Sequence, residues 1–179
     1  MMPTGLTVEA TSPAGAVATY TALALDNVDG VVPVTCVPES GSLFARGATT
    51  VNCSASDSRG NMAAGSFVVT VVNKPPVANP DTAQSQGAAV QIEVLANDTD
   101  VDGGTLTVTE VSAPAHGTAV IGAGGVITYT PAAGFSGDDT FNYTIADSQG
   151  GTATALVTVT VTQAAANPNG LMFGAGRVD

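Results

Sequence analysis

The most regular hydrophobic pattern in this chain is an alternation near its C-terminal end. In residues 155–162, Val157, Val159 and Val161 fall on one face of an extended backbone, and threonines occupy the other face. This period of two predicts a β-strand with one face in a core and the other in water. Shorter runs of the same kind recur along the chain, and no segment gives a convincing amphipathic helix. The pattern therefore predicts an all-β fold.

The predicted strands fall into two groups, separated by a proline-rich stretch at residues 73–80. Prolines fix φ and lack an N–H group, so they end a strand and stiffen a connection. About seven short strands in a unit, with turns between them, are typical of a Greek-key sandwich. We therefore predict two tandem Ig-like Greek-key β-sandwiches. The predicted strands are residues 17–25, 34–36, 49–55, 66–72, 90–95, 106–111, 118–121, 126–130, 140–146 and 153–162.

The two groups end in the same way, with a strand, an Asp-Ser-x-Gly turn and a closing strand. The turns begin at Asp57 and Asp147, and each lies 14 positions before a closing valine, Val71 or Val161. Such a recurring hairpin indicates a tandem array. We expect a first sandwich at 1–73, a Pro-rich linker at 74–79 and a second sandwich at 80–163. Residues 164–179 would form a further linker and the start of a possible further domain, as in a segment of a longer protein.

Composition excludes several classes of partner. The net charge is −11, and Lys and Arg together number only 4. A phosphate backbone or an anionic membrane surface needs cations to neutralise it, so neither is an expected partner. No stretch approaches the roughly 20 apolar residues of a membrane span, so we expect no membrane insertion in this segment.

The chain has two cysteines, Cys36 and Cys53. An even, low count in an acidic, β-rich chain suggests one disulfide and an oxidising compartment. A pair of free, buried thiols remains open on composition alone.

The first half resembles the HYR (hyalin repeat) domain over residues 3–72. The motifs that carry the resemblance lie in order along the chain, at residues 9–15, 26–30, 36–44, 47–53, 56–61 and 67–71. The resemblance implies an Ig-like fold, a Cys36–Cys53 disulfide and a role in extracellular adhesion.

The second half, residues 75–162, resembles a bacterial Ig-like or cadherin-like tandem repeat. Its motifs lie at residues 76–82, 94–103, 117–119, 129–141 and 143–150. Such repeats occur in large bacterial adhesins and as spacers in secreted enzymes, so the resemblance implies an extracellular or cell-surface location.

The strongest candidate for chemistry is the acidic turn formed by Asn97, Asp98, Asp100 and Asp102, followed by two glycines. Alternate carboxylates on a turn can direct oxygens at one centre, and Ca²⁺ takes 6–8 oxygen ligands. The twelfth position of an EF-hand would be Thr109 rather than Glu, so we expect a sandwich loop site instead. A solvated acidic turn without an ion is the alternative.

In the resembling repeats, acidic residues near the start of the module and in the last hairpin lie beside this loop. Asp81 and Asp147 are the matching positions, so the resemblance adds them to the predicted structural Ca²⁺ site. A similar but weaker acidic motif occurs in the first half, where Asp57 with Asp26 or Asp29 could form a second site. An ordinary Asp-Gly turn is the favoured interpretation there.

Other features argue against catalysis. A Ser–His–Asp triad would have to use His116, the single histidine, which lies in a Pro/Gly turn without a Gly-x-Ser-x-Gly elbow. A zinc site needs three or four His or Cys ligands, and we expect the two cysteines to be paired with each other instead. Asp138 and Asp139 are adjacent, so in a strand they would point to opposite faces and could not act as a glycosidase pair.

We therefore expect a non-catalytic structural or adhesive segment of a large secreted or cell-surface bacterial protein, stiffened by Ca²⁺. Its expected partners are neighbouring domains of the same chain and cell-surface protein or glycan ligands. The alternative is a spacer or carbohydrate-binding accessory module of a secreted hydrolase. Sugar binding usually uses exposed aromatics, and aromatic residues make up only 4% of this chain.

Overall fold

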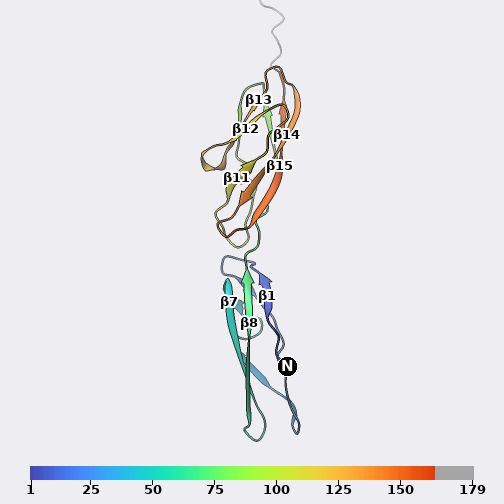
Figure 1. The fold of residues 1–179 in the computed structure, drawn as a ribbon, viewed down its shortest axis with the longest axis vertical. Helices are drawn as coiled ribbons and strands as arrows, with labels where there is room; N and C mark the ends of the chain where they lie inside the picture. Colours follow the sequence, from blue (N-terminus) through green and yellow to red (C-terminus); the bar gives the residue numbers. More distant parts are fainter. Residues whose placement is uncertain (164–179) are drawn as a thin grey trace, which may run out of the picture. The chain divides into compact units, whose positions relative to one another are not determined.

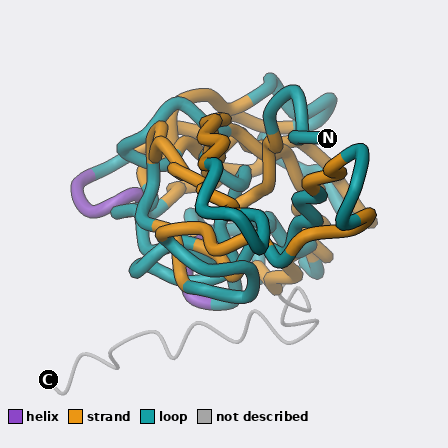
Figure 2. Tube along the Cα trace, turned by 90° about the horizontal axis from the view of Figure 1, so that it is seen from below, coloured by secondary structure: helices purple, strands orange, loops and turns teal. Residues whose placement is uncertain are grey.

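The computed structural model describes residues 1–163; the expected linker and further domain at 164–179 lie outside the described residues. Figure 2 shows strands and loops nearly throughout, with two short helical turns, η1 (Val94–Ala96) and η2 (Ala123–Gly125). These two turns are the helical segments of residues 1–163, and neither is long or apolar enough to cross a membrane. The all-β prediction is confirmed.

The strands number fifteen among the described residues. They are β1 (Leu6–Glu9), β2 (Ala16–Val17), β3 (Ala24–Asp26), β4 (Gly30–Val32), β5 (Val34–Val37), β6 (Leu43–Phe44), β7 (Gly47–Ser56), β8 (Met62–Val72), β9 (Asp81–Ser85), β10 (Val90–Ile92), β11 (Thr107–Val111), β12 (Gly117–Ile121), β13 (Ile127–Pro131), β14 (Gly137–Ala146) and β15 (Thr152–Val161).

The fold divides into two compact units. Within the described residues, the first comprises Met1–Ala78 together with Asn97–Thr107 and Ile145–Ala153, and the second comprises Asn79–Ala96, Val108–Thr144 and residues 154–163. The acidic turn and the last hairpin turn, both predicted as parts of one site, thus belong to the same unit as the chain up to residue 78.

The first unit is built around a long hairpin of β7 and β8, whose register runs from Gly47 opposite Val71 to Ser56 opposite Met62 (Figure 1). The sheet order is β1-β8-β7-β5, and two short pairs, β2–β6 and β3–β4, complete the strands before residue 73. Strand β1 runs parallel to β8. Inward-facing Val51, Phe67 and Val69 join Phe44 in the core, as the period of two requires.

The hairpin turn forms because Asp57 folds the backbone around its own carboxylate. Asp57 Oδ1 accepts hydrogen bonds from the backbone N–H groups of Arg59 and Asn61, at 2.9 and 2.7 Å. Asn61 Nδ2 donates to Asp57 Oδ2 at 2.6 Å, and this side-chain bond is the main cause that lowers the pKa of Asp57. Gly60 has φ +85°, which glycine accepts without strain.

The later strands form two sheets, with orders β10-β13-β12 and β11-β14-β15-β9. In β15, Val157, Val159 and Val161 are all buried, so the predicted strand with one face in the core is confirmed. They share the core with Tyr129 and Tyr143. The first strand, β9, again runs parallel to the last, β15.

Several sequence-based strand boundaries were wrong. The predicted strand at residues 17–25 is two short strands, β2 and β3, with irregular backbone between them. There the backbone N–H of Tyr20 donates to Ser40 Oγ at 2.8 Å instead of to a neighbouring strand. Strands β1 and β9 were not predicted, because each is held by parallel pairing with a strand more than 60 residues away in the sequence.

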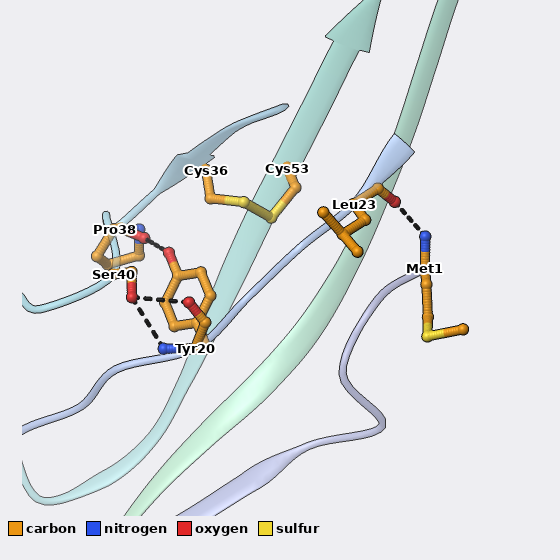
Figure 3. Close-up of a disulfide and its surroundings, with 7 residues drawn as sticks. All are labelled: Met1, Tyr20, Leu23, Cys36, Pro38, Ser40 and Cys53. Carbon is orange, nitrogen blue, oxygen red and sulfur yellow. Dashed lines mark hydrogen bonds between the residues drawn. A yellow bond between two sulfur atoms is a disulfide. The ribbon is translucent and has the colours of Figure 1, made fainter. Parts of the chain in front are cut away.

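Cys36 and Cys53 form a disulfide between β5 and β7 (Figure 3), with an S–S distance of 2.05 Å and a Cα–Cα distance of 4.0 Å. The two residues are direct partners in the antiparallel register, and both side chains are buried. Beside the bridge, the Tyr20 ring packs edge-on against Phe67, and its hydroxyl donates to the carbonyl oxygen of Pro38. The predicted pairing is confirmed.

Candidate metal centre in the acidic loop

The acidic loop, residues 97–104, lies between η1 and β11 and folds around the carboxylate of Asp100. Asp100 Oδ1 accepts the backbone N–H of Asp102 at 3.1 Å, and Oδ2 accepts that of Gly104 at 2.8 Å. Residue 99 is tied to the chain at residue 77, because Val77 and Thr99 exchange backbone hydrogen bonds of 2.8 and 3.1 Å. The loop is therefore an ordered turn with its carboxylates held in place.

Asp102 is the most buried carboxylate of the loop, with 2% of the residue exposed. Its Oδ2 accepts hydrogen bonds from Arg46 Nη1 at 3.3 Å and from the backbone N–H of Lys74 at 3.1 Å. Its Oδ1 is buried and has no hydrogen-bond partner among the described residues. A buried carboxylate oxygen without a partner carries a large desolvation cost, so this atom is where an additional cation would stabilise the loop most.

Asp100 and Asp102 influence each other's protonation. Burial, followed by the neighbouring Asp102 carboxylate, raises the pKa of Asp100. Burial also acts to raise the pKa of Asp102, but the neighbouring Asp100 carboxyl group, the backbone N–H of Lys74 and the charge of Arg46 outweigh it, so the pKa of Asp102 is lowered. Arg46 pairs with Asp102 alone of these two carboxylates, so a cation at Asp102 would also favour the charged form of Asp100.

Asp147 comes from the last hairpin turn and is also buried. Its Oδ1 accepts the backbone N–H groups of Gln149 and Gly151 at 2.7 and 2.8 Å, and its Oδ2 accepts Asn73 Nδ2 at 2.8 Å. Burial acts to raise the pKa of Asp147, but these bonds, Asn73 first, outweigh it and lower that pKa. The carboxylate is therefore ionised and shapes its own turn, as the equivalent Asp57 does.

Two glycines leave the space in which these carboxylates meet. A β-carbon at residue 104 would lie 2.5 Å from Asp100 Oδ2 and 2.8 Å from Asp147 Cβ. A β-carbon at residue 151 would lie 2.3 Å from Asp147 Oδ2. The structure thus brings Asp100 and Asp147 together at Gly104, and the predicted role of glycine after the acidic run is steric as well as conformational.

Gly104→Ala is expected to lower the free energy of unfolding of the first unit by about 1–3 kcal/mol, because the new methyl group would displace the Asp100 carboxylate. Gly65→Ala is the matched control, since its β-carbon would meet only the flexible Met2 side chain, at 3.4 Å or more. Calorimetric melting of both variants checks the difference. Equal melting temperatures would show that the space at residue 104 is not needed.

The remaining predicted ligands lie on two elements. Asn97, exposed, and Asp98, half-buried, occupy the start of the acidic loop. Asp81 is half-buried and is the first residue of β9, opposite Val157 in the parallel register. Their membership of the site stays a prediction.

The residues that surround the carboxylates are not all acidic, and sequence reasoning missed two of them, Arg46 and Asn73. Arg46 Nη1 also donates to Asn73 Oδ1 at 3.2 Å, so a chain of contacts runs from Asp102 through Arg46 and Asn73 to Asp147. Arg46 lies 56 positions from Asp102, and no local motif reports such a distance. The proline-rich stretch that starts at Asn73 was interpreted only as a linker.

The donor set fits a hard divalent cation. All candidate ligand atoms are oxygens, as Ca²⁺ prefers, and Asp102 Oδ1 is buried and unpartnered. Asp26, Asp29 and Asp57 are the group of three carboxylates in residues 1–163 whose ligand atoms lie within 4.8 Å of one another, so the oxygens of Asp100, Asp102 and Asp147 would move closer together to hold the ion. The ion would supply positive charge and order to the loop rather than reactivity.

A second acidic group lies in the first unit. Asp26, Asp29 and Asp57 each offer an oxygen within 4.8 Å of the others. Each carboxylate already accepts hydrogen bonds: Asp26 from Val28 and Asp29 backbone, Asp29 from Ser58, and Asp57 within its turn. The structure brings together the three residues of the weaker predicted site, at partly exposed positions where solvent screens their charges.

His116 and the Asp138–Asp139 pair have structural partners. His116 is exposed and stacks on Phe135, with ring centroids 4.4 Å apart. Asp138 is exposed and accepts Thr160 Oγ1, whereas Asp139 is buried, so the two point to opposite faces as predicted. Asp139 accepts four hydrogen bonds, from the backbone N–H groups of Ala115, His116 and Thr140 and from the Tyr129 hydroxyl.

Solved structures similar to this chain share only low identity with it. The endo-fucoidan hydrolase MfFcnA4 from glycoside hydrolase family 107 is 17% identical, with a TM-score of 0.38 over 90% of this chain and 28% of that one. Drosophila N-cadherin EC1-4 is 14% identical, with a TM-score of 0.42 over 90% of this chain and 49% of that one. BT4661, a SusE-like surface located polysaccharide binding protein from Bacteroides thetaiotaomicron, is 16% identical, with a TM-score of 0.35 over 79% of this chain and 22% of that one.

The chain spans less than half the length of each of these three proteins. No curated protein sequence matches it. Family models match nearly the whole described chain: the HYR domain model at residues 4–71 and the bacterial Ig domain model at residues 73–160. Residues 4–71 are therefore an HYR domain and residues 73–160 a bacterial Ig domain, in the order that the sequence motifs predict.

Proposed function

We propose that this chain is a non-catalytic structural and adhesive segment of a secreted or cell-surface bacterial protein, and that its acidic loop binds Ca²⁺. The order of an HYR domain and a bacterial Ig domain indicates an adhesion or structural module. The observation that carries the calcium part is Asp102, a buried carboxylate whose Oδ1 has no hydrogen-bond partner within residues 1–163.

The charge balance of the loop supports the same proposal. Arg46 is 3.3 Å from Asp102 and is the cation paired with it among the described residues. Asp100 and Asp147 both lie beside Gly104, and neither forms an ion pair with Arg46 among the described residues. A divalent ion would neutralise the excess and order the loop together with the adjoining chain at residues 73–77.

The full chain is expected to melt at a higher temperature in millimolar CaCl₂ than in chelator. An ion that binds only the folded state at 100 times its dissociation constant stabilises that state by about 2.7 kcal/mol. Scanning calorimetry of the wild-type chain in EDTA, CaCl₂ and MgCl₂ measures the shift, and MgCl₂ is expected to give less of it because Mg²⁺ demands near-ideal octahedral geometry.

Asp100→Asn and Asp29→Asn separate the two acidic groups in that experiment. Each substitution removes one negative charge, the first from the acidic loop and the second from the group of Asp26, Asp29 and Asp57. We expect Asp100→Asn to lose the Ca²⁺ response and Asp29→Asn to keep it. The same melting temperature with and without Ca²⁺ in the wild-type chain would contradict the proposal.

A carbohydrate-binding accessory role is the second candidate. One observation favours it: the exposed His116 ring, which stacks on the half-buried Phe135 ring, lines a surface pocket together with Thr118 and Thr130. Aromatic faces and hydroxyl groups are what a sugar ring would contact. The remaining described aromatic residues of the second unit, such as Tyr129 and Tyr143, are fully buried, so any such surface would be small.

A further inference from the structure

Asp102 already has one cation beside it, and this cation has a specific place in the site. The Arg46 side chain is 34% exposed, and its Nη1 donates to Asp102 Oδ2 and to Asn73 Oδ1. Because Oδ2 is occupied in this way and Oδ1 is not, the Asp102 carboxylate offers its two oxygens to two different positive groups. One of these groups is part of the chain, and the other would come from solution.

We propose that Arg46 is a resident counter-ion of the acidic loop, so that Arg46 and Ca²⁺ neutralise the same carboxylates and each weakens the dependence of the fold on the other. This inference rests on the proposed Ca²⁺ site. It assigns to the HYR domain a residue that sets how much Ca²⁺ the acidic loop needs.

Arg46 and a bound Ca²⁺ are coupled through their charges. Without Ca²⁺, Arg46 supplies the positive charge that makes burial of Asp102 tolerable, and the backbone N–H of Lys74 adds a neutral hydrogen bond. With Ca²⁺ bound, the guanidinium and the ion lie near the same carboxylate and repel each other. Arg46 therefore stabilises the Ca²⁺-free loop and opposes tight binding of Ca²⁺.

Arg46→Met removes the positive charge and keeps much of the apolar stem of the side chain. We expect its effect on stability to depend on whether Ca²⁺ is present. In chelator, the first unit of this variant melts at a lower temperature than in the wild-type chain. In millimolar CaCl₂, most of that loss disappears. Ca²⁺ binds the variant roughly tenfold more tightly, the order expected for two like charges separated by several ångströms of partly solvated protein.

Arg46→Lys and Arg59→Met are the controls. Arg46→Lys keeps the charge, so its affinity for Ca²⁺ is expected to stay close to that of the wild-type chain even if its hydrogen bonds change. Arg59→Met makes the same change in net charge at an exposed turn, where it is expected to leave the affinity within about twofold because charges there are screened. All variants are made in the full chain.

Titration calorimetry with CaCl₂ and melting in EDTA or CaCl₂ give independent readouts. Tighter binding in Arg46→Met, with a stability loss confined to chelator, supports the proposal. Unchanged or weaker binding in Arg46→Met, while the wild-type chain responds to Ca²⁺, overturns the role of Arg46 and leaves the site itself standing. Absence of any response in both chains overturns the Ca²⁺ site, and the inference with it.

Discussion

Asp139→Ala is expected to lower the free energy of unfolding of the second unit by about 1–3 kcal/mol, the range for leaving a buried hydrogen-bond donor without its acceptor. The substitution leaves the backbone N–H groups of Ala115, His116 and Thr140 without their carboxylate acceptor, and it leaves the Tyr129 hydroxyl with only the His116 carbonyl oxygen, 3.5 Å away, among the described residues. Tyr129 is fully buried, so water does not replace the lost bond at its hydroxyl.

Asp138→Ala is the matched control, because it removes the same group from the adjacent residue. Asp138 is exposed and bonds only Thr160 Oγ1 among the described residues, so its loss is expected to stay within about 0.5 kcal/mol. Calorimetry of the full chain measures both. Similar losses in the two variants would show that Asp139 does not support the turn at residues 114–116.

The same group gives the second unit a defined response to pH. Burial acts to raise the pKa of Asp139, but the bonds from Tyr129 and from the backbone outweigh it and lower that pKa, so its contribution to stability is present above the ordinary carboxyl pKa and lost as the pH falls through the lowered value. Burial and Asp139 raise the pKa of Tyr129 from 10.0 to about 12. The corresponding stability is complete below pH 10 and is lost between pH 10 and 12, a loss that Tyr129→Phe is expected to lack.

Removing the disulfide, by reduction or by replacing Cys36 and Cys53 with alanine, is expected to destabilise the first unit by about 3 kcal/mol. The bridge spans a sequence separation of 17 residues, and chain-entropy models give this magnitude for a loop of such length. Because the two cysteines are direct partners in the β5–β7 register, the backbone ladder holds their positions in the folded state. The bridge therefore acts mainly on the unfolded chain.

Calorimetry with and without reductant checks this expectation on the full chain. The transition of the first unit should move to lower temperature, while that of the second unit, which contains no cysteine, should stay in place. The double-alanine variant should melt alike with and without reductant. An unchanged first transition in the reduced wild-type chain would rule out a stabilising role for the bridge.

The sequence predicted the strands and turns that are determined by residues close together in the chain. The alternation around Val157 and the Asp-Ser-x-Gly turns at Asp57 and Asp147 carry their own periodicity and capping groups, so they could be recognised from the sequence. Strand β9, with the sequence Asp-Thr-Ala-Gln-Ser, has little intrinsic strand preference and forms because β15 offers it a partner.

In the candidate site, too, only the residues that form a local motif or match a family motif could be predicted. The carboxylates of the loop could be found as a spaced run, and Asp147 was added through the family resemblance. Arg46 and Asn73 could not be found, because they reach Asp102 and Asp147 only after residues 56 and 74 positions apart are brought together by folding. The role of Asp139 was missed for the same reason, since its partners at residues 115 and 116 are more than 20 positions away.

In both β-sandwiches the first strand runs parallel to the last, β1 beside β8 and β9 beside β15. A polypeptide that enters along one of two parallel neighbours and leaves along the other must do so at opposite ends of the pair. A pull on the chain therefore draws the two strands past each other along their length, so the hydrogen bonds between them share the load and must give way together rather than one by one. The topology thus suits a chain that has to bear tension between two distant attachment points.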